Sequence, residues 1–244
     1  MDRKQKVGLL WFLWGVALVL SLLALFVPVQ DEETLPVSAA QRQGGYVALT
    51  FDDGPWPKTT PALLDGLAQR GVKATFFLIG SQVEAQKETV LRMDEEGHQI
   101  GIHTWDHVQL EGLTQTETQT QLDRCRDVLT GLLGPVDLMV RPPYGFVDEN
   151  LKQWAGAPIL CWDVDTLDWQ DKNPDRIVQS VLEETRDGSI ILMHDIFSTS
   201  VEAALRCVDA LLAEGFRFVT LEELFFLRGV TPEDGQVYLA LPPN

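Results

Sequence analysis

Strand-like and helix-like runs alternate along this chain from residue 46 onward, and few folds accommodate such a pattern. Short apolar runs that favour buried strands occupy residues 46–50, 74–79, 99–103, 138–141, 159–163, 189–193 and 216–219. A helix between two strands lets the second strand run parallel to the first. Seven strands, each followed by a helix, therefore predict an α/β fold whose parallel sheet closes into a barrel.

The helix-like runs carry start and stop signals. They run from Thr60-Pro61 to Gly71, from Thr114 to Gly134, from Asn173-Pro174 to Gly188, from Thr199 to Gly215, and onward from Thr220. A glutamate stands three residues after Thr114, Thr199 and Thr220, which is the spacing of a capping box. The chain has 244 residues, a length that suits one domain with a full core.

Residues 7–29 form an apolar run without a charged side chain. A membrane-spanning helix needs about 20 such residues, whereas the apolar part of a secretory signal has about 7–15. Basic residues precede the run and acidic residues follow it, which predicts a cytoplasmic N-terminus and places the rest of the chain outside the cell. We therefore expect a cytoplasmic tip and transmembrane anchor at 1–30, a linker at 31–44 and an extracellular folded domain at 45–244, in a single-pass cell-membrane protein.

The formal net charge of −17 disfavours a nucleic-acid partner, because phosphate backbones are also negative. No protein partner is predicted. The three cysteines, Cys125, Cys161 and Cys207, have no zinc-motif spacing, and an odd number cannot pair fully. We expect mostly buried free thiols.

Polar side chains gather where the predicted strands end. They are Asp52, Asp53, His103, His107, Arg141, Asp163, Asp165, Asp168, His194 and Asp195. Because parallel strands end at the same rim, and barrel enzymes build their active sites there, we expect these side chains to lie together. The remaining histidine, His98, is predicted to lie at the surface or to lead into a strand.

His103 and His107 have the spacing that places two imidazoles on one face of a helical turn. With a carboxylate from Asp52 or Asp53 they would form a two-histidine, one-carboxylate metal site with an open position, as catalytic zinc requires. The other aspartate would then be free to act as a base, and His194 as an acid. Taken separately, these residues also suit a helix surface and an ordinary turn; their joint position on one rim favours the metal site.

The motifs at these positions resemble those of the polysaccharide deacetylases of carbohydrate esterase family 4, the family with the NodB homology domain. The resemblance covers about residues 45–238. Five stretches carry it in order: Thr50-Phe51-Asp52-Asp53-Gly54-Pro55, His103-Thr104-Trp105-Asp106-His107, Arg141-Pro142-Pro143-Tyr144, Asp165-Thr166-Leu167-Asp168-Trp169 and Leu192-Met193-His194. It implies a distorted (β/α)7 barrel and hydrolysis of an N-acetyl group.

The resemblance also implies roles for individual residues. Asp52 is the general base, and Asp53, His103 and His107 hold a divalent metal, usually zinc and sometimes cobalt or another ion. Arg141 pairs with Asp52 and orients it.

The remaining implied roles concern the substrate. The backbone N–H of Tyr144 helps to hold the oxyanion. Asp168 supports the protonated form of His194, the general acid. Trp169 and Leu192 line the apolar slot for the acetyl methyl group.

The expected substrate is an N-acetylated cell-wall polysaccharide, because the anchor places the domain outside the membrane. Peptidoglycan N-acetylglucosamine is the first choice and N-acetylmuramic acid the second; chitin-type oligomers and acetyl-xylan are alternatives. The rival functions are a non-catalytic carbohydrate-binding module on the same fold and a metal-dependent esterase or phosphoesterase. Trp56, Trp105, Phe146 and Trp169 are candidate stacking platforms for sugar rings or, equally, core residues.

Overall fold

The structure, a computed structural model, describes residues 44–243. The predicted anchor at 1–30 and nearly all of the predicted linker at 31–44 lie outside the described residues. Between residues 44 and 243, no helix is both long and apolar enough to cross a membrane.

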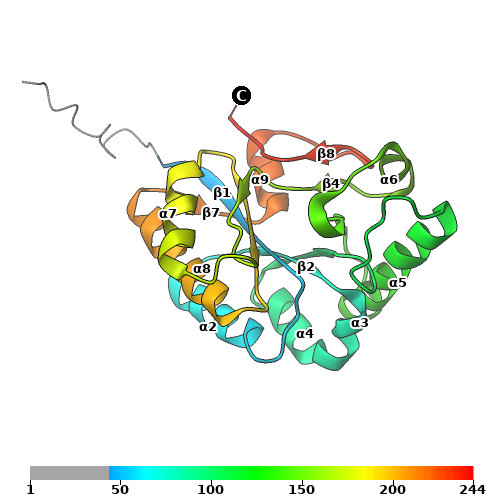
Figure 1. Cartoon of the computed structure of the whole chain (residues 1–244), viewed down its shortest axis with the longest axis horizontal. Coiled ribbons are helices and arrows are strands. Elements are labelled where there is room, and N and C mark those ends of the chain that lie inside the picture. Colours follow the sequence, from blue (N-terminus) through cyan, green and yellow to red (C-terminus); the bar gives the residue numbers. More distant parts are fainter. Residues whose placement is uncertain (1–43, 244) are drawn as a thin grey trace, which may run out of the picture. The chain divides into compact units, whose positions relative to one another are not determined.

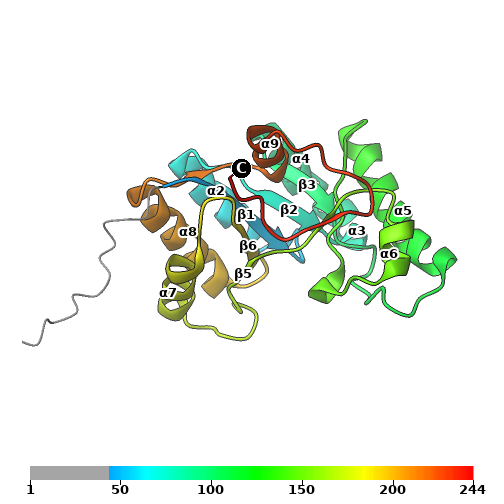
Figure 2. The same cartoon turned by 90° about the horizontal axis from the view of Figure 1, so that it is seen from above.

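The described residues form an α/β fold around a parallel sheet, as predicted (Figures 1 and 2). The strands are β1 (Tyr46–Asp52), β2 (Thr75–Leu78), β3 (Gln99–Ile102), β4 (Ile159–Leu160), β5 (Val164–Asp165), β6 (Ile190–His194), β7 (Arg217–Phe218) and β8 (Val237–Tyr238). The main sheet has the order β3-β2-β1-β6-β5, and β7 pairs with the start of β1. Parallel bridges at Val140 continue the pairing from β3 to β4, which pairs with β8.

The predicted succession of seven strands, each followed by a helix, is wrong in two places. The run 138–141 contributes only the bridging residue Val140, and the run 159–163 gives β4 but no strand beyond Leu160. The strands β5 and β8 were not predicted, and β5 follows β4 without a helix between them. Within the described part, the series of paired strands is interrupted between β5 and β8, which do not pair with each other. Beyond β8, Ala240 forms an antiparallel bridge with Ser189, just before β6.

Helices surround the strands, with α7 and α8 on one side and α5 and α6 on the other (Figure 1). They are α2 (Thr60–Arg70), α3 (Gly80–Val83), α4 (Lys87–Glu95), α5 (Gln115–Leu133), α6 (Glu149–Trp154), α7 (Pro174–Glu184), α8 (Ser198–Ala213) and α9 (Leu221–Arg228), with short 3-10 turns at Glu84–Gln86 and Pro143–Gly145. Neighbouring helices contact one another in the order α7, α8, α2, α4, α5, α6.

The helix signals of the sequence were largely correct. Thr114 and Thr220 form the predicted capping boxes at the starts of α5 and α9. Thr199 does not, because α8 already begins at Ser198 and its N-terminus has no side-chain cap. The helix α7 ends at Glu184, before the predicted stop at Gly188.

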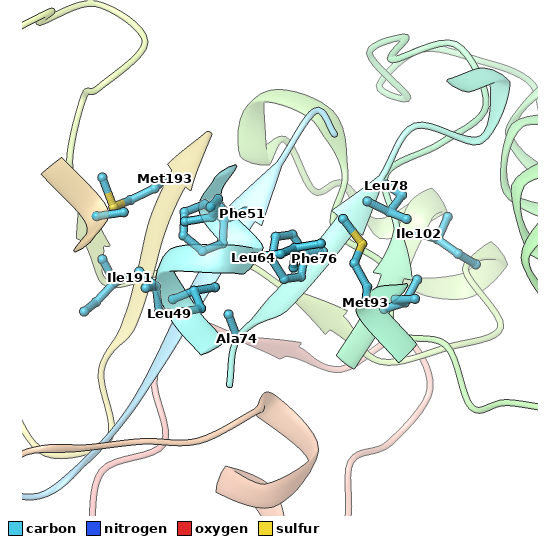
Figure 3. Packing of buried hydrophobic residues seen from close by; sticks show 14 of the residues in the cluster. Leu49, Phe51, Leu64, Ala74, Phe76, Leu78, Met93, Ile102, Ile191 and Met193 are labelled. Atoms are coloured by element: carbon cyan, nitrogen blue, oxygen red, sulfur yellow. The ribbon is translucent and has the colours of Figure 1, made fainter. Parts of the chain in front are cut away.

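Side chains along β1 alternate between the two faces of the sheet. Val47, Leu49 and Phe51 lie in the large apolar cluster between the sheet and the helices. Figure 3 shows part of this cluster, including Leu49, Phe51, Leu64, Phe76, Ile191 and Met193. The even-numbered residues Thr50 and Asp52 therefore point to the inner face of the sheet, although both are buried.

Helix α9 covers the inner face at the end where the strands begin. Leu221 and Phe225 are buried in a second apolar cluster with Ile190 at the start of β6. The backbone N–H of Leu221 donates to Thr75 Oγ1 at the start of β2, over 3.1 Å. Apolar side chains thus fill most of this end, whereas Asp52 and His194 lie at the other end of the strands.

His98 is not a surface residue, although it does lead directly into β3 as predicted. Its side chain is buried, its ring packs edge-on against Phe76, and its Nδ1 accepts from the Ala74 N–H over 3.1 Å. This acceptor role requires a neutral ring. Burial and the nearby Lys73 ammonium lower the pKa of His98 to about 4.

The predicted free, buried thiols are confirmed for Cys125, Cys161 and Cys207. Burial raises the pKa of the Cys125 and Cys207 thiols to about 12, which makes them unreactive at neutral pH.

Candidate active site

Asp52 and His194 end neighbouring strands at the same level of the sheet. They are register partners between β1 and β6. Asp52 is almost fully buried, and its Oδ1 accepts from Arg141 Nη1 over 2.9 Å. Its Oδ2 lies 3.8 Å from His103 Nε2. One carboxylate oxygen of Asp52 is therefore held in place, and the other faces the histidines.

Arg141 is fully buried, and its guanidinium is hydrogen-bonded on several sides. Besides Asp52, it donates to Thr50 Oγ1 over 2.7 Å and to the carbonyl oxygens of Leu160 and Cys161 over 3.0 and 2.9 Å. These two carbonyls lie where the predicted strand 159–163 stops after β4. The guanidinium, whose N–H donors have a fixed planar arrangement, thus connects the end of β1 to the backbone at the end of β4.

Asp53, His103 and His107 bring three acceptor atoms to one point. Asp53 Oδ1 lies 3.4 Å from His103 Nε2 and 3.1 Å from His107 Nε2, and one ligand atom from each residue lies within 4.8 Å of the others. The Arg141 carbonyl oxygen lies 2.8 Å from His103 Nδ1 and can only accept, so His103 carries its proton on Nδ1 and leaves Nε2 as an acceptor.

Asp53 Oδ1 is buried and has no hydrogen-bond partner among the described residues. A buried acceptor without a donor is costly unless a cation satisfies it. Two imidazoles and one carboxylate are also the donor set of catalytic zinc sites with an open position. The geometry of Asp53, His103 and His107 therefore fits a divalent metal ion.

The backbone reaches this geometry through left-handed residues, not through the predicted helical turn. Residues 103–107 form a loop in which Thr104 and His107 have φ values of 65° and 56°. Asp53 has φ 72°, which turns its side chain toward the rim that Asp52 already faces. Non-glycine residues in this region cost about 1–3 kcal/mol each, so tertiary contacts must hold them.

Asp168 holds His194 at two points. Its Oδ1 lies 2.7 Å from His194 Nδ1, and its Oδ2 accepts from the His194 backbone N–H over 2.8 Å. Burial by itself lowers the pKa of His194, but the hydrogen bond and charge of Asp168 outweigh burial and raise this pKa to about 9. At neutral pH the ring is protonated, and its Nε2 has a proton to donate.

The three residues predicted to bind the substrate, Tyr144, Trp169 and Leu192, also lie at or near the carboxyl ends of the strands. Tyr144 is 59% exposed, has φ 64°, and its ring lies edge-on to His107 with 5.0 Å between centroids. Trp169 is 51% exposed and directly follows Asp168. Leu192 is buried in β6, and its carbonyl oxygen accepts from Thr166.

Three of the four aromatic residues proposed as sugar platforms are exposed. Trp56, Phe146 and Trp169 are 42%, 49% and 51% exposed. Trp105 is only half-buried but has the Arg124 guanidinium 4.0 Å above its ring, which covers one face. Of the four, Trp105 is therefore the one that packs as a structural residue.

Two aspartates predicted at the rim have other roles. Asp163 lies where β6 begins, and accepts from Ser189 Oγ over 2.8 Å and from the Ile190 N–H over 2.7 Å. Asp165 accepts from the Leu167 N–H two residues on, in a local turn. The expectation that Asp163 lies with the other polar side chains at the strand ends was thus wrong, because buried backbone N–H groups at strand starts also need acceptors.

Sequence reasoning gave no role to Thr50, Thr60 or Asp195. The alternation along β1 was a usable signal for Thr50, since it places Thr50 on the same face as Asp52. No comparable signal pointed to Thr60, whose hydroxyl donates to the fully buried carboxyl of Asp195. Burial raises the pKa of Asp195 to about 7.

Comparisons with known proteins identify the family of this chain. The sequence profile of the family described as polysaccharide deacetylase matches residues 39–157. The peptidoglycan-N-acetylmuramic acid deacetylase PdaC of Bacillus subtilis is 40% identical over 178 residues, which cover 73% of this chain and 38% of that protein. This chain thus matches well under half of the length of that relative.

Two further similarities extend over most of the compared protein. A peptidoglycan-N-acetylglucosamine deacetylase of Bacillus cereus is 41% identical over 186 residues, covering 73% of this chain and 68% of that protein. The structure of a family 4 acetyl xylan esterase from Clostridium thermocellum, in complex with a cobalt ion, matches with a TM-score of 0.77 and 30% identity, covering 81% of this chain and 99% of that one. With the five motifs placed around one site, this chain belongs to the polysaccharide deacetylase family.

Proposed function

We propose that this chain is a metal-dependent hydrolase that removes N-acetyl groups from a cell-wall polysaccharide. The observation that carries the proposal is the group of Asp53, His103 and His107 acceptors beside a buried carboxylate, Asp52, and the His194 imidazole that Asp168 contacts. A metal site flanked by a base and an acid is suited to hydrolysis of an amide.

Asp53, His103 and His107 would hold the ion, and we propose zinc, with cobalt or another divalent ion as alternatives. The cobalt ion reported with the Clostridium thermocellum esterase supports a divalent metal in this family. When bound, such an ion polarises a carbonyl oxygen and lowers the pKa of a water molecule.

Asp52 acts as the general base in this proposal. Arg141 holds its Oδ1, so Oδ2 is the oxygen available to take a proton from the attacking water. The water oxygen adds to the acetyl carbonyl carbon, and the backbone N–H of Tyr144 helps to hold the oxygen that becomes negative.

His194 acts as the general acid. Its Nδ1 is engaged by Asp168, so Nε2 donates its proton to the sugar nitrogen as the carbon–nitrogen bond breaks. The products are acetate and a free amine on the sugar. Trp169 and Leu192 are proposed to line the slot for the acetyl methyl group, and Trp56 and Phe146 to stack on sugar rings.

We propose peptidoglycan N-acetylglucosamine as the substrate, with N-acetylmuramic acid second. The names of the Bacillus cereus and Bacillus subtilis relatives support these two sugars. Chitin-type oligomers and acetyl-xylan remain alternatives, because the same site chemistry removes acetyl groups from each of them.

We propose that the apolar run at residues 7–29 anchors the protein in the cell membrane with the catalytic domain outside. This rests on the length of the run and on the charges that flank it. Protease added to intact protoplasts should then remove the domain while leaving the N-terminus protected. Complete protection of the domain would mean that the orientation is reversed.

Acetate release from muropeptides, chitin oligomers and acetyl-xylan tests the proposed activity. The full chain, purified in a mild detergent and loaded with zinc, should release acetate fastest from muropeptides that carry N-acetylglucosamine. Sugar binding without any acetate release would identify a carbohydrate-binding module. Elemental analysis should find one divalent ion per chain, and turnover that persists in the metal-free protein would exclude the mechanism.

A further inference from the structure

The loop that carries the proposed metal ligand Asp53 is held from behind by a side chain that directly follows β6. Asp195 directly follows His194, and its carboxyl lies against Gly54, where a Cβ atom would be only 2.5 Å from Oδ2. Only glycine leaves room for the carboxyl here. Asp195 is fully buried, so this contact is part of the packed interior.

The same carboxyl also fixes the far end of the loop. The Thr60 hydroxyl, at the start of α2, donates to Asp195 Oδ2. Thr60 Oγ1 in turn accepts from the Trp56 N–H over 2.7 Å. A chain of hydrogen bonds therefore runs from β6 through Thr60 to the middle of the loop at 53–59.

The opposite side of the loop is held by residues that follow β2, namely Ile79 and, in α3, Gln82. The Gly54 carbonyl oxygen accepts from the Ile79 N–H over 2.9 Å, and the Asp53 carbonyl oxygen accepts from Gln82 Nε2 over 3.3 Å. Asp53 itself has φ 72°, a conformation that costs about 1–3 kcal/mol for a residue with a side chain. The loop would relax from this conformation if one of its two supports were lost.

We propose that Asp195, acting through Gly54 and Thr60, is a positioning residue that holds Asp53 in the geometry needed to bind the metal. This inference rests on the proposed metal site. Asp195 does not belong to the ligand group of Asp53, His103 and His107, so it would act on the metal from behind, through the loop that carries Asp53. Its loss should weaken metal binding more than it weakens the acid pair of Asp168 and His194.

Zinc affinity of the metal-free full chain, measured in competition with a chromogenic chelator, tests the proposal. The Asp195→Ala variant should bind zinc about 10–100-fold more weakly, as is typical when a group behind a ligand is removed. At saturating zinc its kcat should largely recover. Asp195→Asn, which can still accept from Thr60, should bind nearly as well as the wild type.

Asp163→Ala is the control at the opposite end of β6, because the Asp163 carboxylate also accepts from a hydroxyl, that of Ser189, where β6 begins. It should lower stability without changing zinc affinity. If Asp195→Ala does not fold, Thr60→Val should show the weaker affinity and Thr60→Ser should restore it. Wild-type affinity in Asp195→Ala or Thr60→Val, or an equal loss in Asp163→Ala, would overturn the inference. A wild-type chain that binds no zinc would instead overturn the proposed function.

Discussion

Asp52 of β1 and His194 of β6 are register partners, so the proposed base and the proposed acid lie side by side on neighbouring strands, on the inner face of the sheet. The two side chains have neighbours of opposite charge. Arg141 contacts the Asp52 carboxylate, whereas Asp168 contacts the His194 imidazole. Arg141 orients the Asp52 carboxylate, whereas the negative charge of Asp168 favours the imidazolium form of His194, which can donate a proton.

The pH dependence of turnover should report on the pair of Asp168 and His194. A general acid must be protonated, so the rate should fall as the pH rises through the pKa of His194, which is about 9. Asp168→Asn removes the charge that raises this pKa, and the fall should move to lower pH with a large loss of kcat. Asp165→Asn, at a turn nearby, should leave the profile unchanged. A fall at the same pH in Asp168→Asn would contradict the assignment of His194.

Asp52→Asn should separate catalysis from metal binding. The amide cannot take a proton from water, and general base catalysis contributes about 10²–10⁴-fold, so kcat should drop by that factor. Zinc should remain bound, because Asp53, His103 and His107 are intact. His103→Ala should lose both zinc and turnover. Wild-type turnover in Asp52→Asn would refute the role of Asp52.

Arg141→Lys should destabilise the domain strongly. A lysine cannot replace the bonds of the buried guanidinium to Asp52, Thr50 and the two backbone carbonyls. Breaking a buried charge pair typically costs about 3–5 kcal/mol, which urea unfolding at pH 7 can measure. Arg206→Lys changes an exposed ion pair and should alter stability by less than about 1 kcal/mol. Equal effects of the two variants would argue against the structural role of Arg141.

His98 should make the domain sensitive to mild acid. The unfolded chain binds a proton on this ring near pH 6.5, whereas the folded protein does so only near pH 4. The free energy of unfolding should therefore decrease as the pH falls from about 6.5 to about 4. His98→Asn can still accept from the Ala74 N–H but does not titrate, so its unfolding free energy should depend less on pH across this range. An unchanged dependence would mean that other groups cause it.

Sequence patterns determined the parts of this protein that depend on neighbours along the chain. Apolar alternation located β1, β2, β3 and β6, and two capping boxes placed the starts of α5 and α9, because these signals act within a few residues. The motifs, through resemblance, also indicated the family and the residues that gather at the site. The short strands β5 and β8 were not predicted, whereas β4 and β7, which are equally short, fell within predicted apolar runs.

Only the tertiary structure decided which oxygen, nitrogen or face each side chain presents. The histidines meet Asp53 through left-handed loop residues and not through a helix, and the Arg141 carbonyl sets the protonated nitrogen of His103. Asp163 and Asp168, five residues apart, serve opposite ends of β6. These outcomes depend on contacts between residues far apart in the sequence, whose energies outweigh local preferences once the strands are packed together.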